Sequence, residues 1–238
     1  YLIMGVIGIF YPIFLRKHTI WKEIPFYLLV SLLLFIFSND RLLFGATTDA
    51  ISPLDGIFLL GHFGVFLLYI LQTFREMNAV ISTGNITISN SRITTYLISG
   101  ILAVTMGSEI VVQEAGNLAR SFGYSEKMAG IIFLAPGTSL PELAASVSAA
   151  IRKRLDLAIG NVIGANILNI VLVLGVSSLL NGITYDYALN FDIFFAFFGV
   201  LLLFISMFSG RSRVLDRWEA FVFFIFFVGY IYFLFIRQ

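Results

Sequence analysis

The stretch APGTSLPELAASVSAAIRKRLDLAIGNVIGANILNI, residues 135–170, places polar residues inside a chain that otherwise consists mainly of apolar segments. Pro141 has no N–H group, so the carbonyl of Gly137 loses its helical partner. Glu142 follows directly, and an ionisable residue within a membrane span is by default a functional hypothesis. A membrane helix that is interrupted by Gly and Pro and carries an acid indicates the ion site of a transporter.

Spacing predicts that the polar groups of this stretch converge. Thr138 lies four residues before Glu142 and Ser139 lies three before it, so one helix face would carry all three. The next helix has a second face with residues at steps of four, namely Asn161, Ala165 and Asn169. Hydroxyl, carboxylate, amide and carbonyl oxygens suit a hard cation such as Ca²⁺ or Na⁺ better than zinc or copper.

GTSLPEL followed by GNVIGANILNI resembles the second alpha-repeat of the calcium:cation antiporters, the superfamily of the sodium/calcium exchangers. The family pattern has A-x-G-T-S-x-P-E on one helix, a short basic loop, and G-N-x-x-G-S-N-x-x-N/D on the next. Asn161 and Asn166 are equally compatible with helix packing and with a supporting role beside the ion ligands. The resemblance implies these ligands: the carbonyl of Ala135 and the side chains of Thr138, Ser139, Glu142 and Asn169.

Two positions depart from the family pattern. Ala165 stands where the family usually has a serine, whose hydroxyl is implied to serve a sodium site. Asn169 stands where the family can have an aspartate, which removes one possible charge. These departures leave the coupling ion open between Na⁺ and H⁺.

The composition predicts a polytopic membrane protein, because 59% of the 238 residues are hydrophobic and only 12% are charged. The chain has no cysteine, which excludes disulfides and thiolate metal sites. We find no nucleotide-binding loop, catalytic triad or zinc motif in the sequence. We therefore expect no enzyme activity and no cofactor, with ions and the lipid bilayer as partners and no nucleic acid.

The apolar segments predict an all-α membrane helix bundle of about eight spans. A span needs about 20 apolar residues, and all segments but the first are long enough. The first segment begins at Tyr1 inside an apolar run, so we expect a helix that starts upstream in a longer protein. The segments run roughly over 1–15, 25–44, 54–74, 93–119, 126–151, 157–180, 188–209 and 218–236.

Charge predicts the orientation of the bundle. When alternate loops are assigned to the two sides, one side has eleven basic residues and the other has four. The positive-inside rule places the first side in the cytoplasm and the C-terminus outside, in what we expect to be a prokaryotic cell membrane. The cytoplasmic set comprises Arg16, Lys17, Lys22, Arg75, Arg92, Arg152, Lys153, Arg154, Arg211, Arg213 and Arg217, against Arg41, Arg120, Lys127 and Arg237 outside.

An internal repeat is visible in two pairs of segments. Glu23-Ile24-Pro25-Phe26 is similar to Asp192-Ile193-Phe194-Phe195, and Leu54-Asp55 precedes Tyr69 at the spacing with which Leu215-Asp216 precedes Tyr230. The charge assignment makes the two copies face opposite ways, as in inverted-repeat transporters.

The repeat predicts how the chain divides. Residues 1–74 would be the C-terminal part of the first copy, 75–92 a cytoplasmic linker, and 93–238 the second copy, with the alpha-repeat at about 126–180. The family resemblance implies ten spans in all. Two of these, with a partner for Glu142, would lie upstream.

The resulting prediction is a secondary antiporter that exchanges Ca²⁺ for Na⁺ by alternating access, with H⁺ or another divalent cation as the alternative ions. A cation channel is disfavoured because a channel filter usually lies on the axis of a symmetric oligomer. An intramembrane enzyme with Ser139 as nucleophile would need a nearby His or Lys base, and no predicted span near this residue contains one.

Overall fold

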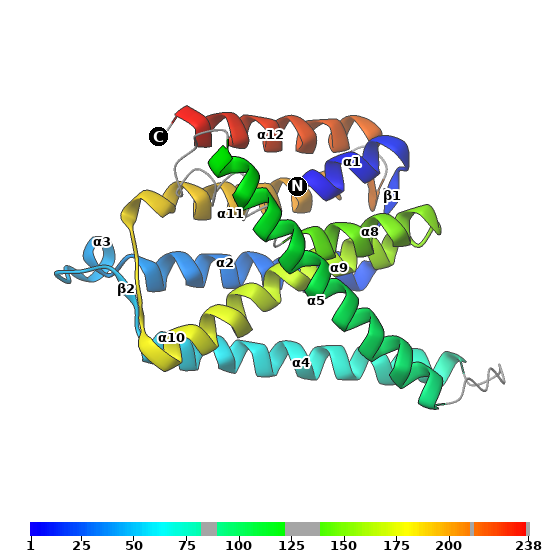
Figure 1. Cartoon of the computed structure of the whole chain (residues 1–238), viewed down its shortest axis with the longest axis horizontal. Coiled ribbons are helices and arrows are strands. Elements are labelled where there is room, and N and C mark those ends of the chain that lie inside the picture. The colour runs from blue at the N-terminus through cyan, green and yellow to red at the C-terminus, as the bar shows by residue number, and fades with distance from the viewer. Residues whose placement is uncertain (82–89, 122–138, 210–211, 237–238) are drawn as a thin grey trace. The chain divides into compact units, whose positions relative to one another are not determined.

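The computed structural model describes residues 1–81, 90–121, 139–209 and 212–236. The chain forms two compact units: a large unit of Tyr1–Thr73 with Ser146–Gln238, and a small unit of Phe74–Ala145. In chain order (Figure 1) the elements are α1 (Leu2–Phe10), β1 (Ile13–Phe14), the π-helix η1 (Thr19–Glu23), α2 (Ile24–Ser38), α3 (Asp40–Phe44), β2 (Ala50–Ile51), α4 (Pro53–Ile81), α5 (Asn90–Ser121), α8 (Leu140–Ile151), α9 (Leu155–Leu168), the π-helix η3 (Asn169–Leu174), α10 (Gly175–Asn181), β3 (Ile183–Thr184), the 3₁₀-helix η4 (Tyr187–Leu189), α11 (Asn190–Ser206), β4 (Val214–Leu215) and α12 (Arg217–Ile236).

The prediction of a helical membrane bundle is confirmed. Six helical stretches of the described chain are long and apolar enough to cross a membrane. The first predicted segment forms only the nine-residue helix α1, and the fifth is described only from residue 139 onward. The six spans are Thr19–Ser38, Pro53–Glu76, Ser91–Leu118, Leu155–Asn181, Tyr187–Ser206 and Arg217–Leu234.

The core of the large unit is built on one face of α9. Ile159, Ile163 and Ile167 recur at steps of four and are almost completely buried. This spacing places all three on the same side of the helix, where they join buried residues of α2 and α11 such as Val30 and Leu203. The opposite face is free to carry the small and polar residues of the predicted ion site.

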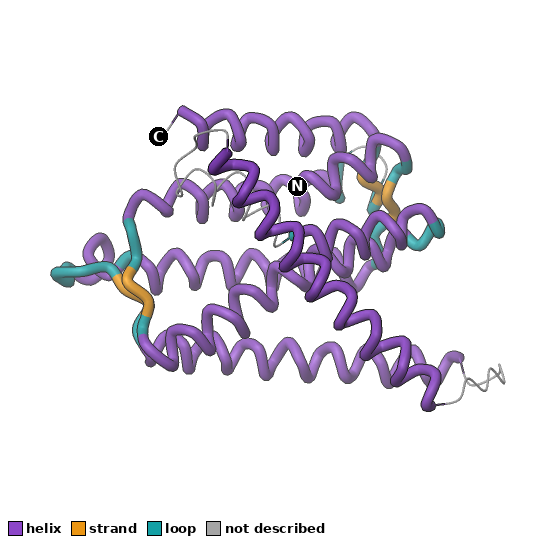
Figure 2. Tube along the Cα trace, in the orientation of Figure 1, coloured by secondary structure: helices purple, strands orange, loops and turns teal. Residues whose placement is uncertain are grey.

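Two short antiparallel ladders connect the first and second copies of the repeat. Ile13 pairs with Leu215 in the ladder of β1 and β4, and Ile51 pairs with Ile183 in the ladder of β2 and β3. Figure 2 shows them at opposite ends of the large unit. A strand of two residues shows no alternation of apolar and polar residues, so the sequence predicted only helices.

Two helix crossings of the large unit are equivalent. A Cβ on Gly5 of α1 would lie 2.9 Å from the backbone N of Phe224 in α12, and one on Gly175 of α10 would lie 3.2 Å from Cγ of Leu60 in α4. The equivalent glycines are 170 residues apart and their partners are 164 apart. At the next turn, the same offsets relate the contact of Gly8 with Ala220 to that of Ser178 with Gly56. Helix α1 is therefore the counterpart of α10.

The starts of α4 and α12 correct the predicted alignment of the two copies. The backbone N–H of Ser52 donates to Asp55 Oδ2 at 2.8 Å, and that of Asp216 donates to Glu219 Oε2 at 2.8 Å. Both are capping boxes, in which the acid in the third position of a helix binds the N–H of its N-cap residue. Asp55 therefore corresponds to Glu219, three residues beyond the Asp216 with which the sequence aligned it.

The two tyrosines of the predicted repeat make equivalent contacts. The hydroxyl of Tyr69 donates to Glu23 Oε1 at 2.8 Å, and that of Tyr230 donates to Asp192 Oδ1 at 2.9 Å. In each copy, the last long helix is thus joined to the start of the preceding long helix by a tyrosine and an acid. These contacts support the repeat that the sequence indicated.

Helices α2 and α11 pack against each other with different chemistry at their two ends. The amides of Asn39 and Asn190 are hydrogen-bonded to each other, at 2.8 and 2.5 Å, and Tyr185 donates to Asn190 Oδ1 at 3.0 Å. At the other end, the rings of Trp21 and Phe208 meet edge to face, with centroids 5.6 Å apart. These two contacts are equivalent, because each residue of one lies 169 positions from a residue of the other.

Basic loops gather at the end that carries β1 and β4. The backbone N–H of Leu15 donates to the carbonyl of Arg213 at 2.9 Å. The guanidinium of Arg16 forms an ion pair of 2.5 Å with Asp156, just after the basic loop 152–154. Three loops that the sequence assigned to the same side of the membrane therefore meet in space.

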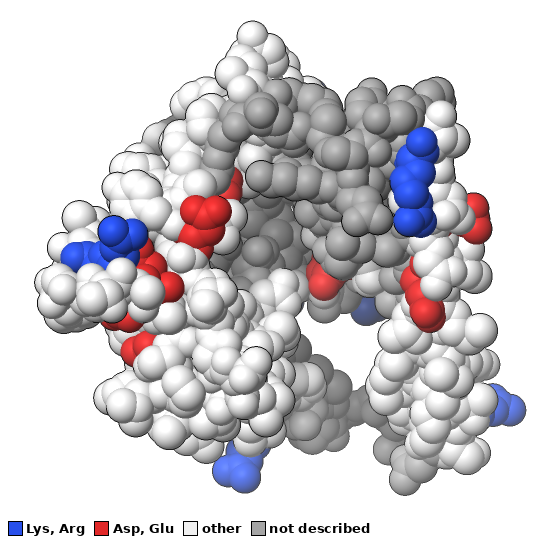
Figure 3. Space-filling model, turned by 60° about the vertical axis from the view of Figure 1, so that its left-hand side comes forward, with Lys and Arg blue, Asp and Glu red and all other residues white. Residues whose placement is uncertain are grey.

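Acidic residues gather at the end that carries β2 and β3. Figure 3 brings this end forward and shows a surface that is largely uncharged, with charged side chains in a few groups. Asp49 is buried and accepts a hydrogen bond from the backbone of Arg41 at 2.8 Å. Burial raises the pKa of the Asp40 carboxyl, and the charges of Asp55 and Asp49 raise it further. The two ends of the large unit thus differ in charge as the sequence predicted.

Candidate ion-binding site

The interruption that Pro141 predicted appears as the start of helix α8. The backbone N–H of Leu143 donates to the carbonyl of Ser139 at 3.0 Å, so Ser139 lies at the beginning of the helix. Pro141 lies in the first turn, where its missing N–H has no helical partner to lose. Glu142 also lies in this turn, where the positive end of the helix dipole favours a carboxylate.

Two of the predicted ligands, Ala135 and Thr138, lie outside the described residues. Ser139 and Glu142 belong to the small unit, whereas Asn169 belongs to the large unit. The gathering of these five residues around one ion therefore stays a prediction.

Ser146 connects the two helices of the motif and was missed by the sequence analysis. It lies one turn after Glu142 on α8, and its hydroxyl donates to the carbonyl of Ala158 on α9 at 3.2 Å. The amide of Asn161 donates to the same hydroxyl at 3.1 Å. The signal in the sequence was the step of four from Glu142 to Ser146, which places them on one helix face.

The contacts of Asn161 and Asn166 are those of packing residues. Asn161 reaches across to Ser146, as described above, and Asn166 donates to the carbonyl of Val162 in its own helix at 2.7 Å. Ala165 is partly buried on the same helix. Of the two interpretations that the sequence left open for these asparagines, their contacts favour helix packing.

Asn169 marks a change of helix type. The α-helix α9 ends at Leu168, and the π-helix η3 begins at Asn169 and runs to Leu174. A short π-helical turn within a helix is rare and often occurs at a functional site. No pattern in the sequence predicted this turn, although Asn169 itself was predicted as a ligand.

Carboxylates alone do not form the site in the described residues. Among them, no group of three or more His, Cys, Asp or Glu side chains is arranged to hold a metal ion. A calcium site in this part of the chain would therefore depend on hydroxyl, amide and carbonyl oxygens in addition to Glu142.

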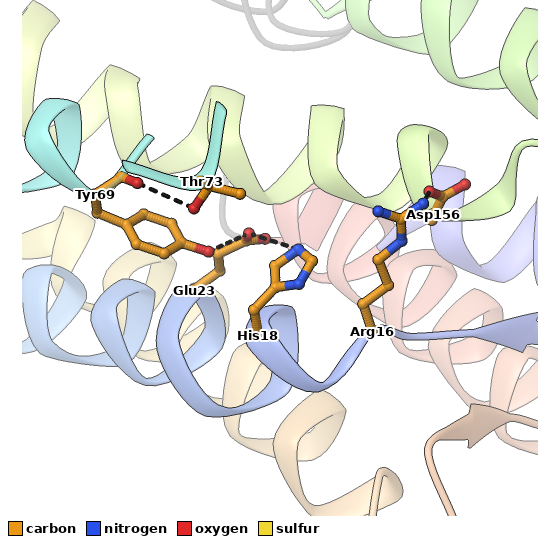
Figure 4. Close-up of polar contacts among 6 residues, drawn as sticks. All are labelled: Arg16, His18, Glu23, Tyr69, Thr73 and Asp156. Atoms are coloured by element: carbon orange, nitrogen blue, oxygen red, sulfur yellow. Dashed lines mark hydrogen bonds and ion pairs between the residues drawn. The ribbon is translucent and has the colours of Figure 1, made fainter. Parts of the chain in front are cut away.

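A second polar cluster lies at the start of α2, and Figure 4 shows its side chains. The hydroxyl of Tyr69 and the imidazole of His18 both point toward the carboxylate of Glu23. The first donates to Oε1 at 2.8 Å, and Nε2 of the second lies 3.7 Å from that oxygen. The carbonyl of Tyr69 accepts a hydrogen bond from Thr73 at 3.0 Å.

A family model described as "Sodium/calcium exchanger protein" matches residues 92–236. The match covers the second predicted copy of the repeat, including α8 and α9. The chain is also similar to CaxA of Alkalimonas amylolytica, with 32% identity over 98% of this chain and 74% of that protein. The sodium/calcium exchanger MaX1 of Methanosarcina acetivorans is 36% identical over 48% of this chain and 33% of its own length.

The fold resembles that of a solved transporter. The structure of the sodium-calcium exchanger NCX_Mj, soaked without Na⁺ and Ca²⁺, matches with a TM-score of 0.73 and 30% identity. The match covers 97% of this chain and 70% of that one. The structure of the same exchanger soaked with 2.5 mM Na⁺ and 1 mM Sr²⁺ matches with a TM-score of 0.75.

Proposed function

This chain belongs to the sodium/calcium exchanger family, and we propose from that premise that its protein exchanges Ca²⁺ for Na⁺ across a membrane by alternating access. The observation that carries the proposal is the position of Glu142, in the first turn of a helix that begins within an apolar segment. A carboxylate at membrane depth attracts a cation, and the start of the helix keeps it near exposed backbone groups.

The proposed ion site combines one charged ligand with several neutral ones. Glu142 would supply the charge that holds Ca²⁺, and a partner acid is expected from the first copy of the repeat. Sodium ions would occupy overlapping subsets of the same oxygens, so that Ca²⁺ and Na⁺ cannot both be bound fully. This competition would make exchange obligatory. The ligands proposed are Ala135, through its carbonyl, and the side chains of Thr138, Ser139, Glu142 and Asn169.

The repeat gives the proposed division of the chain. Residues 1–74 would complete the first copy, 75–92 would connect the copies, and 93–238 would form the second. The paired crossings and the paired contacts of Tyr69 and Tyr230 support this division. The long helix α5 would slide to expose the site to each side in turn.

Ala165 favours a second candidate, an antiporter driven partly by protons. It lies one turn before Asn169 and offers no hydroxyl to a sodium ion. We therefore expect calcium uptake to depend weakly on sodium, and Ala165→Ser to strengthen that dependence while calcium affinity changes little. One added coordinating oxygen corresponds to about 1–3 kcal/mol of binding free energy.

The experiment measures calcium uptake into vesicles against stepped sodium gradients at fixed pH, for the protein as its gene encodes it and for Ala165→Ser. Uptake driven by a proton gradient alone would favour the second candidate. Uptake that no counter-ion gradient alters would indicate a channel and contradict antiport. Identical, steep sodium dependence in both proteins would show that Ala165 is not at a sodium site.

The proposed orientation places the end with β1 and β4 in the cytoplasm and the C-terminus outside. The gathering of basic loops at that end supports this, because positive charge accumulates on the cytoplasmic side. The chain has no native cysteine, so single cysteines can be labelled selectively. Arg152→Cys is expected to react with an impermeant maleimide only from the cytoplasm, and Tyr187→Cys only from outside. The reverse pattern would overturn the orientation.

A further inference from the structure

A groove on the large unit lies between the start of α2 and the middle of α4. Its volume is about 190 Å³. The rings of Phe26 and Phe66 stack with centroids 5.5 Å apart and form an apolar wall, and Val65 is exposed beside them. The residues that line the groove are Lys22, Glu23, Phe26, Val65, Phe66 and Tyr69.

One end of this groove is polar, and its cation is available to a ligand. The ammonium of Lys22 lies 5.4 Å from the centre of the Tyr69 ring. Within the described residues, Lys22 forms no ion pair. The nearby acid, Glu23, instead binds the hydroxyl of Tyr69 and lies close to His18 (Figure 4). A positive charge therefore stands at the end of an apolar groove.

The position of Lys22 along its helix corresponds to the depth of lipid headgroups. It lies in the first turn of the span Thr19–Ser38. Its neighbour Trp21 is 56% exposed, and exposed tryptophans in membrane proteins concentrate at the boundary between headgroups and acyl chains. A lysine at this depth extends its ammonium toward phosphate groups.

The second copy of the repeat shows that the fold does not require this cation. The offsets of 169 and 164 residues relate Lys22 and Tyr69 to Phe191 and Phe233. The latter two rings stack with centroids 3.8 Å apart. The same contact is thus made by two apolar rings at one end of the unit and by a cation and a ring at the other. The charge belongs specifically to the end with the basic loops.

We propose that this groove binds one anionic phospholipid, with its phosphate on Lys22 and an acyl chain along Phe26, Val65 and Phe66. Basic pockets between membrane helices on the cytoplasmic side favour anionic headgroups, because the phosphate adds a charge interaction to the apolar contact. The site is separate from the residues proposed to bind the transported ions. It therefore stands whether or not the proposed ion coupling is correct.

The test measures lipid binding to the purified protein by native mass spectrometry, with phosphatidylglycerol and phosphatidylcholine as probes. Lys22→Gln is expected to weaken phosphatidylglycerol binding about fivefold, the effect of one basic residue near the membrane surface, and to leave phosphatidylcholine binding unchanged. Lys17→Gln is the matched control, because it removes the same charge from an exposed position of the same basic loop but does not line the groove.

A second variant tests the apolar part of the site. Val65→Trp fills the groove beside Phe66 and is expected to weaken binding of both lipids, while the melting temperature reports whether the protein remains folded. Equal losses in Lys22→Gln and Lys17→Gln would show that surface charge attracts the lipid without a site. Unchanged phosphatidylglycerol binding in Lys22→Gln or in folded Val65→Trp would also overturn the proposal.

Discussion

Replacing Glu142 with glutamine is expected to abolish calcium exchange while the protein still folds. The substitution keeps the size and hydrogen-bonding oxygen of the side chain but removes the one charge that the described part of the motif offers to Ca²⁺. Two unit charges 4 Å apart attract each other by about 4 kcal/mol at an effective dielectric constant of 20, which corresponds to about a thousandfold in affinity. Calcium uptake into vesicles, with and without a sodium gradient, measures the loss.

The matched control for this experiment is Glu109→Gln. Glu109 is another acid within a candidate span, on α5, but it is not among the predicted ligands. Its replacement is expected to leave most of the exchange activity, which would show that removing an acid from a span is not enough. Normal calcium uptake in folded Glu142→Gln would refute the proposed role of this residue.

Replacing Gly56 with alanine is expected to destabilise the large unit by about 1–3 kcal/mol, the usual cost of forcing a methyl group into a packed interface. A Cβ at this position would lie 2.6 Å from Ser178 Oγ and 2.8 Å from the carbonyl O of Gly175. The second contact is with backbone, so the two helices would have to move apart. Thermal unfolding of the purified protein in detergent measures the effect.

Gly64→Ala, on the same helix, is the control for Gly56→Ala. A Cβ on Gly64 would meet nothing within 4 Å. Alanine has the higher helix propensity, so this variant is expected to be unchanged or slightly more stable. Equal melting temperatures for the two variants would contradict the close crossing of α4 and α10.

The sequence predicted the bundle well, because the length and hydropathy of a membrane span are properties of one segment and need no tertiary information. The repeat was also visible, since Tyr69 and Tyr230 follow similar segments. Its register was wrong near Asp55 because short matches of Leu-Asp pairs do not reveal which acid caps a helix. The ladders of β1 with β4 and β2 with β3 were not predictable, since each depends on residues far apart in the chain.

For the candidate site, the pattern identified single residues better than their surroundings. Pro141 and Glu142 indicated where a helix is interrupted, and α8 does start there. Spacing could not show that Asn161 would bind Ser146, because the partner lies on another helix whose rotation is set by packing. The π-helical turn at Asn169 arises from backbone geometry and has no residue signature here.

The ladder of β1 with β4 has a consequence for the order in which the protein is assembled. It joins residues about 200 positions apart, and contacts between distant residues form late because a long loop must close first. A chain that enters the membrane from its N-terminus makes β1 and α1 long before their partners β4 and α12 exist. The face of α1 that carries Gly5 and Gly8 must therefore wait for the last span to be synthesised. Biogenesis, unlike the finished fold, does not treat the two copies alike.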